Sequence, residues 1–486
     1  MREGSPETAM RLERDELGER ALPADALYGI HALRAFENFN LAARPVHAEL
    51  IHAYGAVKLA CVRTAVALGA WPDARKAAAL ERACEEMAAG ALDASVRVDA
   101  LQGGAGTSLN MNVNEALANR ALHHLGLPPG RYDAVSPDDA NMHQSTNDTF
   151  PTALRVAAIR RLRELEQELV SLQESFQAKE KAFADVVKVG RTELQDAVLI
   201  TLGREMGAYA EAFNRDRWRL YKAEERLRVV NLGGTAVGTG LGAPRAFIFR
   251  VVDELRGITG LGLSRAENLV EATQNADVFA EVSGLLRTCA TSLIKVCGDL
   301  RLLASGPDAG LAEIRLPARQ AGSSIMPAKV NPVIPEAVTQ GAMLTLGYDA
   351  ALVQAVAAGS LELNPFLPLI AFCLLESAGL LARAVRSLRT GVVEGMEADA
   401  GQCRRHLDGA TAAATALIPA LGHARAAAVA AEARATGATV RAVCLARGFM
   451  TAEQFETLIS PEAVCRLGSP DGQRGDTVPD PARRMP

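Results

Sequence analysis

The chain has 486 residues, 49% hydrophobic and 22% charged, so it can bury a substantial core and exceeds the usual size of a single domain. Its formal charge is −5, from 52 basic and 57 acidic residues with no block of like charge, which disfavours nucleic acid or an anionic membrane as a partner. We therefore expect a small-molecule substrate.

The N-terminal sequence, MREGSPETAMRLERDELGER, lacks the apolar core of a secretory signal. No later stretch runs about eighteen apolar residues without charge, so membrane insertion is not indicated either. The eight cysteines are scattered without a CxxC pair and lie mostly among apolar residues in helical patterns, which argues against a structural zinc site. A reducing cytoplasm is the expected location.

Long amphipathic helices are the dominant pattern in the middle of the chain. From Ile159 apolar residues recur every three or four positions, and a second such run starts at about Leu202. A third run covers residues 277–303, and two more helices are expected after Pro335 and over about residues 368–393. Alternating β-branched runs are scarce. The predicted fold class is mainly α, around a central bundle of long helices.

Two changes in composition divide the chain into three expected domains. Turn residues gather in LPPGRYDAVSPDD (residues 127–139), and GVVEGMEADAGQC changes the pattern near residue 396. We predict an N-terminal helical domain over residues 1–140, the central bundle over 141–395 and a small C-terminal domain over 396–486. The tail from about residue 468 is polar and rich in Pro and Gly, so we expect it to stay loose.

Two polar motifs place hydroxyl and amide groups beside helix starts. In QGGAGTSLNMNVNEALANRAL the glycines allow close backbone approach and Thr107 or Ser108 can cap the following helix, which suits a carboxylate seat. In QSTNDTFPTALR the side chains of Ser145, Thr146 and Asn147 offer several donors, and Asn147 can also accept, which suits an anion together with an ammonium. For both motifs, plain helix capping is the alternative interpretation.

A third polar motif, GRTELQDA, interrupts two helical patterns and places Thr192 and Glu193 at a turn. The alternative is that Glu193 is a helix-capping acid.

The glycine-rich NLGGTAVGTGLGAP (residues 231–244) lacks the GK[ST] ending of a phosphate loop and no strand pattern precedes it, so nucleotide binding is not expected. The eight histidines show no metal-ligand spacing, so a catalytic metal is not indicated. We expect no cofactor.

The stretch AGSSIMPAKVNPVIPEA (residues 321–337) is a small polar loop in a chain otherwise rich in helix formers. It resembles the signature of the fumarase and aspartase superfamily, and PAKVNP leans toward the members that release ammonia from aspartate. Further segments resemble motifs of that family in its order, over roughly residues 11–465: LPADALYGIHALRAFENF, QGGAGTSLNMNVNEALANRAL, QSTND, GRTxLQDA, NLGGTAVGTG, AENLVEATQ and LELN.

This resemblance implies a mainly α, three-domain protomer that forms a homotetramer with active sites shared between subunits. The implied reaction is the reversible anti-elimination of ammonia from L-aspartate to give fumarate, through a serine base and an aci-carboxylate intermediate. The expected ligand is thus a small dicarboxylate or amino acid. Activation by a divalent cation, as in some relatives, stays open, although no ligand set is visible in the sequence.

The resemblance also implies roles for single residues. Ser323, the first serine of the loop, takes the Cβ proton, and Lys329 and Asn331 grip the α-carboxylate. The residues that hold the β-carboxylate as its charge grows are Thr107, Ser145 and Thr146. The residues that face the leaving ammonium are Asn147, Thr192 and Glu193. Arg34 matches an arginine that the family associates with activity, and we expect it to act from behind the substrate-binding groups.

Two departures from the family pattern leave the substrate open. Relatives usually carry histidine or glutamine where this chain has Glu193, and Pro365 and Phe366 replace other apolar residues. A glutamate there can pair with an ammonium, or donate a proton to the leaving group if it is desolvated and protonated. It can equally indicate a C–N lyase on a different aspartate-like substrate.

Two further functions stay open as alternatives. Fumarate hydratase would use the same base and carboxylate seats on malate, but the absence of histidine at position 193 and the presence of Ala328 argue against it. The alternative from another class is a catalytically silent structural or binding protein on a lyase scaffold. Retention of Ser323, Lys329 and Asn331 argues against that one.

Overall fold

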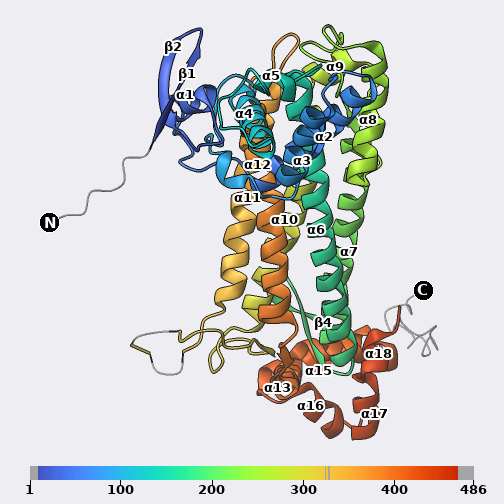
Figure 1. Cartoon of the computed structure of the whole chain (residues 1–486). Coiled ribbons are helices and arrows are strands. Elements are labelled where there is room, and N and C mark those ends of the chain that lie inside the picture. The colour runs from blue at the N-terminus through green and yellow to red at the C-terminus, as the bar shows by residue number, and fades with distance from the viewer. Residues whose placement is uncertain (1–8, 323–324, 327–328, 469–486) are drawn as a thin grey trace, which may run out of the picture. The chain divides into compact units, whose positions relative to one another are not determined.

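The computed structural model describes residues 9–322, 325–326 and 329–468 (Figure 1). Helices dominate these residues, which confirms the mainly α fold class. The chain forms two compact units, each assembled from three separate segments. Unit 1 contains residues 1–167, 216–291 and 341–383, and unit 2 contains residues 168–215, 292–340 and 384–486. The three domains expected from the sequence stay a prediction.

Five long helices contribute residues to both units, and they carry the apolar spacing seen in the sequence. They are α6 (Thr146–Ala182), α7 (Leu202–Leu227), α10 (Asp277–Leu303), α11 (Val333–Ala357) and α12 (Leu367–Leu388). The helices predicted from Ile159, from Leu202 and over residues 277–303 are thus confirmed. Helix α6 begins before its apolar pattern, because residues 148–159 are buried on every side and show no period.

The other elements of unit 1 are β1 (Met10–Asp15), β2 (Gly18–Pro23), α1 (Ile30–Asn38), α2 (Ala48–Ala67), α3 (Ala74–Ala88), η1 (Asp93–Ser95), α4 (Thr107–His124), α5 (Pro137–Ala140), β5 (Val229–Val230), α8 (Arg245–Thr259), β6 (Ser264–Arg265) and α9 (Leu269–Gln274). Helices α2, α3 and α4 lie side by side (Figure 1). Helix α2 is buried along most of its length. At Gly55 a Cβ atom would lie 2.3 Å from the backbone nitrogen of Ala88, so α2 and α3 meet at backbone contact distance.

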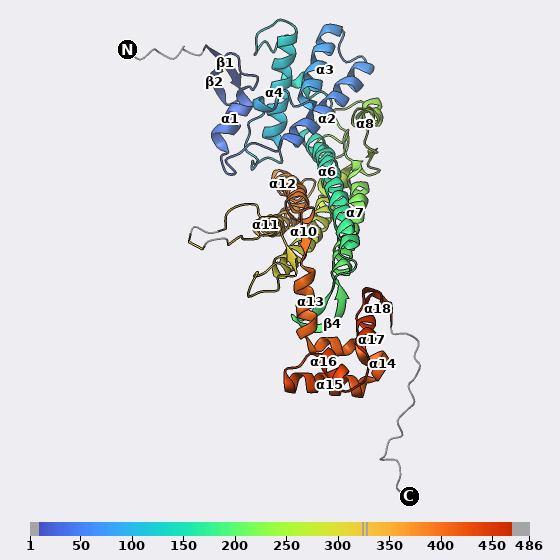
Figure 2. The same cartoon turned by 90° about the horizontal axis from the view of Figure 1, so that it is seen from below.

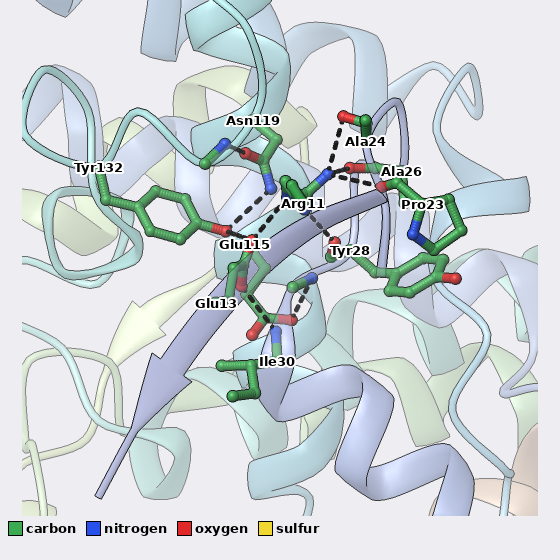
Figure 3. Close-up of polar contacts among 12 residues, drawn as sticks. Arg11, Glu13, Pro23, Ala24, Ala26, Tyr28, Ile30, Glu115, Asn119 and Tyr132 are labelled. Atoms are coloured by element: carbon green, nitrogen blue, oxygen red, sulfur yellow. Dashed lines mark hydrogen bonds and ion pairs between the residues drawn. The ribbon is translucent and has the colours of Figure 1, made fainter. Parts of the chain in front are cut away.

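A buried polar network ties the β1–β2 hairpin to the start of α1 (Figure 3). The Arg11 guanidinium donates to Glu13 and to four carbonyl oxygens, those of Pro23, Ala24, Ala26 and Tyr28. Glu13 accepts from the Ile30 N–H, and Glu115 of α4 accepts from the N–H groups of Gly29, His31 and Ala32. Burial raises the pKa of Glu115 to about 7. Two carboxylates therefore satisfy the first N–H groups of α1, the helix that carries Arg34.

The other elements of unit 2 are β3 (Val187–Thr192), β4 (Gln195–Thr201), β7 (Ile314–Arg315), η2 (Arg389–Val393), β8 (Glu397–Ala398), α13 (Ala400–Gly409), η3 (Thr411–Leu417), α14 (Ile418–Leu421), α15 (His423–Thr436), α16 (Val440–Ala446), α17 (Ala452–Leu458) and α18 (Pro461–Cys465). Figure 2 shows the short helices gathered beside β4. Their apolar core includes Val189 and Leu199 of the β3–β4 hairpin together with Leu417, Cys444 and Phe455. The hairpin is thus held by its inward face against these helices.

Strands are few among the described residues, as the sequence indicated, and they pair only into two-stranded sheets. Two helical stretches, Ala48–Ala67 and Leu367–Val393, are long and apolar enough to cross a membrane by length and composition alone. However, 78% and 72% of their most apolar windows are buried inside the protein, as in core helices. All eight cysteines, which lie within the described residues, are free.

Candidate functional site

The residues expected to bind substrate fall into two groups, one in each unit. Unit 1 holds Thr107, Ser145, Thr146 and Asn147. Unit 2 holds Thr192, Glu193, Lys329 and Asn331. The expected base, Ser323, lies outside the described residues. Each group is described within its own unit.

Three residues of the first group, Ser145, Thr146 and Asn147, lie in the entry turn of α6, residues 141–148. Ser145 caps the helix, because its Oγ accepts from the N–H of Asn147 at 3.3 Å and its own N–H donates to Asp148 at 2.9 Å. The capping alternative is therefore correct for Ser145. It does not exclude ligand binding, since Thr146 is the first residue of a 37-residue helix whose amino end favours anions.

The entry turn is fastened to the glycine-rich loop that follows β5. The Asp148 carboxylate accepts from the N–H groups of Gly233 and Thr235, each at 3.0 Å. The Asn231 amide donates to the Asn147 carbonyl and to the Thr273 hydroxyl of α9, both at 3.0 Å. NLGGTAVGTG thus contacts both QSTND and AENLVEATQ in unit 1. The glycine-rich loop serves here as a scaffold for the entry turn.

Asn147 has one polar atom left for a ligand. Its side-chain N–H donates to the Ala236 carbonyl at 2.7 Å, and its backbone carbonyl is used by Asn231. Among the described residues no hydrogen bond reaches its amide oxygen, an acceptor that suits an ammonium group. The role expected for Asn147 stays a prediction.

Thr107 does not cap α4, contrary to the expectation from the sequence. The N-cap is Gly106 at φ +94°, where a Cβ atom would lie 2.1 Å from the ring of Phe150, so only glycine fits. Gln102 satisfies the helix instead, since its amide oxygen accepts from the Leu109 N–H at 2.7 Å. Thr107 is exposed and donates to the Gly104 carbonyl at 2.7 Å, which leaves its oxygen able to accept from a ligand.

In unit 2, Thr192 and Glu193 lie at the tip of the β3–β4 hairpin, residues 192–195. Thr192 pairs with Gln195, and between them Glu193 and Leu194 have φ angles of +53° and +62°. Two successive positive φ values are the pattern of a type I′ turn. All four tip residues are exposed. The alternative reading of Glu193 as a helix-capping acid is therefore wrong.

A buried ionic cluster anchors strand β3 below this tip. Glu313 is fully buried and contacts Lys188 at 2.9 Å, Arg191 at 2.9 Å and His406 at 3.0 Å. Burial alone would raise the pKa of Glu313, but these contacts outweigh it and leave the pKa below its ordinary value. Because Arg191 directly precedes Thr192, the cluster fixes where the exposed tip begins.

Asn331 closes the neck of the loop that contains Ser323. Its side-chain N–H donates to the Gly322 carbonyl at 3.0 Å. At Gly322 a Cβ atom would lie 2.0 Å from the Lys329 carbonyl oxygen, so glycine is required for this close approach. Lys329 is exposed, as are Ile325 at 83% and Val330 at 50%. The Lys329 ammonium is thus accessible to a ligand, while the Asn331 amide makes a bond within the loop.

Arg34 binds within its own unit. Its guanidinium makes a bidentate contact with Asp15, at 2.6 and 2.7 Å, and donates to the Gly18 carbonyl. This hydrogen bond is the main reason why the pKa of Asp15 is lowered to about 2. Arg34 therefore secures the β1–β2 hairpin, and its expected place behind the binding groups stays a prediction.

Sequence reasoning missed three residues that build the entry turn. Asp148 and Asn231 are fully buried and bond to the turn, and so is Lys58 of α2, whose ammonium contacts Asn141 and Gln144. Asp148 stands three residues after Ser145, the spacing of a capping box, which could have indicated it. Lys58 is the lone charge in the apolar run AYGAVKLACV, and a lysine in such a run is unusual in a buried helix.

Among the described residues, no three or more His, Cys, Asp or Glu side chains come together as a metal site would require. The expectation that the protein needs no cofactor stays a prediction.

Comparison with known families identifies the superfamily of the chain. A family model described as "Lyase" matches residues 18–347, and one described as "Fumarase C C-terminus" matches residues 414–466. The chain belongs to the fumarase and aspartase superfamily. This superfamily assignment confirms the resemblance noted in the sequence, and it makes the protein a lyase by family.

Curated relatives in the superfamily cover most of the chain. The aspartate ammonia-lyase of Bacillus subtilis (strain 168) is 42% identical over 463 residues, which are 94% of this chain and 96% of the relative. The aspartate ammonia-lyase of Pseudomonas aeruginosa is 45% identical over 423 residues, which are 86% of this chain and 89% of the relative.

Solved structures of superfamily members share the fold. A fumarate lyase:delta crystallin from Brucella melitensis bound to cobalt superposes with a TM-score of 0.90 at 45% identity, covering 93% of this chain and 99% of that one. A class II fumarase from Schistosoma mansoni gives a TM-score of 0.87 at 29% identity, covering 94% of this chain and 99% of that one. The fumarase-like fold is thus confirmed.

Proposed function

We propose that this protein is an aspartate ammonia-lyase that converts L-aspartate reversibly to fumarate and ammonia. The observation that carries the proposal is its identity of 42% to a curated aspartate ammonia-lyase along 94% of the chain. The entry turn of α6 supports it, because a helix amino end and an amide oxygen are presented together. These groups suit the two ends of the substrate that must be held, a carboxylate and an ammonium.

The chemical difficulty lies in removing a proton from the carbon beside a carboxylate. The electron pair left on Cβ moves into that β-carboxylate, which becomes a dianionic aci-carboxylate. Donors fixed in advance around it lower the barrier most. We assign this task to Thr107, Ser145 and Thr146, the last two at the positive end of α6. The fastening of the turn through Asp148 supports the assignment, since donors held in place need no reorganisation during the reaction.

The second step breaks the C–N bond. The electron pair returns from the aci-carboxylate to form the C=C bond of fumarate, and nitrogen leaves with the bonding pair. We assign the ammonium to Asn147, Thr192 and Glu193, and the α-carboxylate to Lys329 and Asn331. The exposed ammonium of Lys329 and the acceptor oxygen of Asn147 support these roles.

We further propose that the complete site is assembled in a cytoplasmic homotetramer. The exposed hairpin tip supports shared sites, because the side chains of Thr192 and Glu193 lie on the surface of their own unit. In the assembly they would meet groups from other copies. Measuring the molar mass in solution tests this part of the proposal separately.

The proton acceptor is assigned to Ser323. Ser323→Ala should lower kcat by at least about a thousandfold while dicarboxylate binding and assembly stay intact, because the hydroxyl acts only while the proton moves. Steady-state kinetics with L-aspartate and calorimetric binding of succinate measure the two effects. A variant that keeps its rate within about tenfold of wild type, roughly 1.4 kcal/mol in barrier, would remove Ser323 from the role.

The activity itself is tested by following the ultraviolet absorbance of fumarate with one substrate at a time. L-aspartate should give rapid formation of fumarate and L-malate should give almost none. Rapid turnover of malate would establish a fumarate hydratase. Turnover only of other aspartate-like amines would establish a C–N lyase of different specificity, which the glutamate at position 193 favours as the second candidate. No turnover of any of them by a well-folded protein would indicate a silent member.

A further inference from the structure

The feature that the proposed chemistry does not use is the buried lysine of α2. Lys58 is 0% exposed in a helix whose other buried residues are mostly apolar. Its ammonium donates to the Gln144 amide oxygen at 2.8 Å and to the Asn141 amide oxygen at 3.2 Å. Both acceptors belong to the entry turn of α6, and Gln144 directly precedes Ser145. The bonds thus connect the core helix to the start of the expected substrate-binding segment.

Asp148 is the nearest buried group of opposite charge in the same turn. It is 0% exposed and, within the part of the chain that the structure describes, it accepts from three backbone N–H groups, those of Ser145, Gly233 and Thr235. No ion pair within 4.0 Å joins it to Lys58 among the described residues. Ser145 therefore lies between Gln144, which accepts from the Lys58 ammonium, and Asp148, whose carboxylate accepts from the Ser145 N–H.

We propose that Lys58 is a positioning residue for the substrate, which fixes the entry turn through Gln144 and Asn141 and sets a positive charge behind Ser145 and Thr146. This proposal rests on the proposed dicarboxylate chemistry of that turn. The substrate class it implies is an anion, because a charge in a low-dielectric interior acts on a ligand more strongly than one in water.

A purely structural role explains Lys58 poorly. A buried ammonium loses its hydration, and two neutral amide oxygens recover only part of that free energy. Methionine would fill the same apolar space without this penalty. What the ammonium adds is charge and the fixed position of Gln144, and both are useful at a site that binds an anion.

The charge of Lys58 is also poised to change near neutral pH. Burial lowers the pKa of Lys58 to about 8, although the neighbouring Asp148 carboxylate opposes the shift. The other titratable groups that face it are Cys61 of α2 and Cys84 of α3, whose thiols burial keeps protonated. Lys58 is thus charged below about pH 8, and its help to an anionic ligand is lost as the pH rises through that value.

The test is the pH dependence of succinate binding, measured by calorimetry from pH 6 to pH 9.5 on the full-length enzyme. Succinate is used because it has no amine that titrates in this range and cannot react. Wild-type affinity should fall as the pH rises through about 8. In Lys58→Met we expect affinity at pH 7 to be lower by at least about tenfold, with the fall near pH 8 abolished.

A second variant moves the transition in the opposite direction. Gln144→Glu keeps the acceptor for Lys58 but makes it a carboxylate, which favours the charged lysine and should raise the pH of the transition by about one unit. A role in folding alone predicts no such movement. Should Lys58→Met fail to fold, this variant decides the question by itself.

Thr64→Val serves as the matched control on the same helix. Thr64 is 4% exposed and bonds only within α2, to the Ala60 carbonyl at 2.7 Å, so its removal should leave the binding profile unchanged. A profile without a transition near pH 8 in wild type, or one unmoved in both Lys58→Met and Gln144→Glu, would overturn the proposal. Because succinate binding needs no turnover, this outcome is distinct from a failure of the protein to act on aspartate.

Discussion

The entry turn of α6 and the tip of the β3–β4 hairpin carry neighbouring roles in the proposed reaction, yet they are built in opposite ways. In the entry turn Asp148 is fully buried and Thr146 is 8% exposed, and the Asn231 side chain and the Thr235 N–H from another segment of unit 1 bond to the turn. At the hairpin tip all four residues are exposed, and the buried anchoring stops at Arg191. The entry turn is thus held in place by bonds within its own unit, whereas the hairpin tip exposes its side chains to solvent.

The two regions also differ in backbone strain. The entry turn contains a single non-glycine residue at positive φ, His143 at +61°, before the regular helix begins. The hairpin tip places Glu193 and Leu194, both with a Cβ atom, at positive φ angles that glycine and asparagine adopt far more easily. Such conformations cost on the order of 1–3 kcal/mol each and persist where the surroundings or the function demand them. We infer that the identity of residue 193 is set by what it meets in the assembled site and not by the turn.

The largest expected effect comes from removing the carboxylate that holds the entry turn. Asp148→Ala leaves the N–H groups of Ser145, Gly233 and Thr235 buried without their acceptor, so the free energy of unfolding should fall by roughly 3 kcal/mol or more. Activity should fall with it, because the donors of the turn lose their fixed position. Denaturant unfolding and steady-state kinetics measure the two changes. Wild-type stability in this variant would mean that the entry turn is not held from within.

A smaller effect is expected at the hairpin tip, and it should appear in kinetics without a change in stability. Glu193→Gln keeps the shape of the side chain but removes its charge, so KM for aspartate should rise by about tenfold while the unfolding midpoint stays constant. Glu193→His gives the residue usual in relatives as a comparison. If either change instead raises the activity on aspartate, Glu193 selects another substrate. Unchanged KM, kcat and pH profile in both would remove it from the site.

The smallest effect tests the strain directly. Leu194→Gly relieves the positive φ angle at the second turn position, so the free energy of unfolding should rise by about 0.5–1 kcal/mol. A shift of the thermal midpoint in a purified sample measures this. Leu194 is 72% exposed in this chain. A loss of stability in Leu194→Gly would mean that the Leu194 side chain makes stabilising contacts that outweigh the backbone strain.

Much of the fold could be predicted from the sequence, because the long helices display their buried faces as a regular period. The pattern from Leu202 matched the first residue of α7. The β3–β4 hairpin was missed because its tip reads Glu-Leu, without the Asn-Gly or Asp-Gly that normally marks a type I′ turn. The cap of α4 was misplaced for a similar reason, since Gln102 reaches Leu109 from outside the usual N-cap position.

The candidate site was predictable only where the functional residues lie close together in the sequence. Ser145 and Asn147 lie beside the start of a predicted helix, so their positions indicate capping or ligand binding. Lys58 could not be linked to them, because 83 residues separate it from Asn141 and 86 from Gln144, and only the packing of α2 beneath the turn brings them together. The reverse holds for Glu193, which the sequence singles out as a departure from the family pattern but whose side chain is exposed in its own unit.

We propose that the entry turn of α6, with its carboxylate-binding helix end and its ammonium-accepting amide oxygen, makes this superfamily member release and add ammonia. The most direct measurement is carbon NMR of labelled fumarate incubated with the enzyme and ammonium chloride in one tube, where ammonia and water compete for the same double bond. We predict that L-aspartate accumulates and that malate stays at the level of an enzyme-free control. Accumulation of malate in place of aspartate would contradict the account.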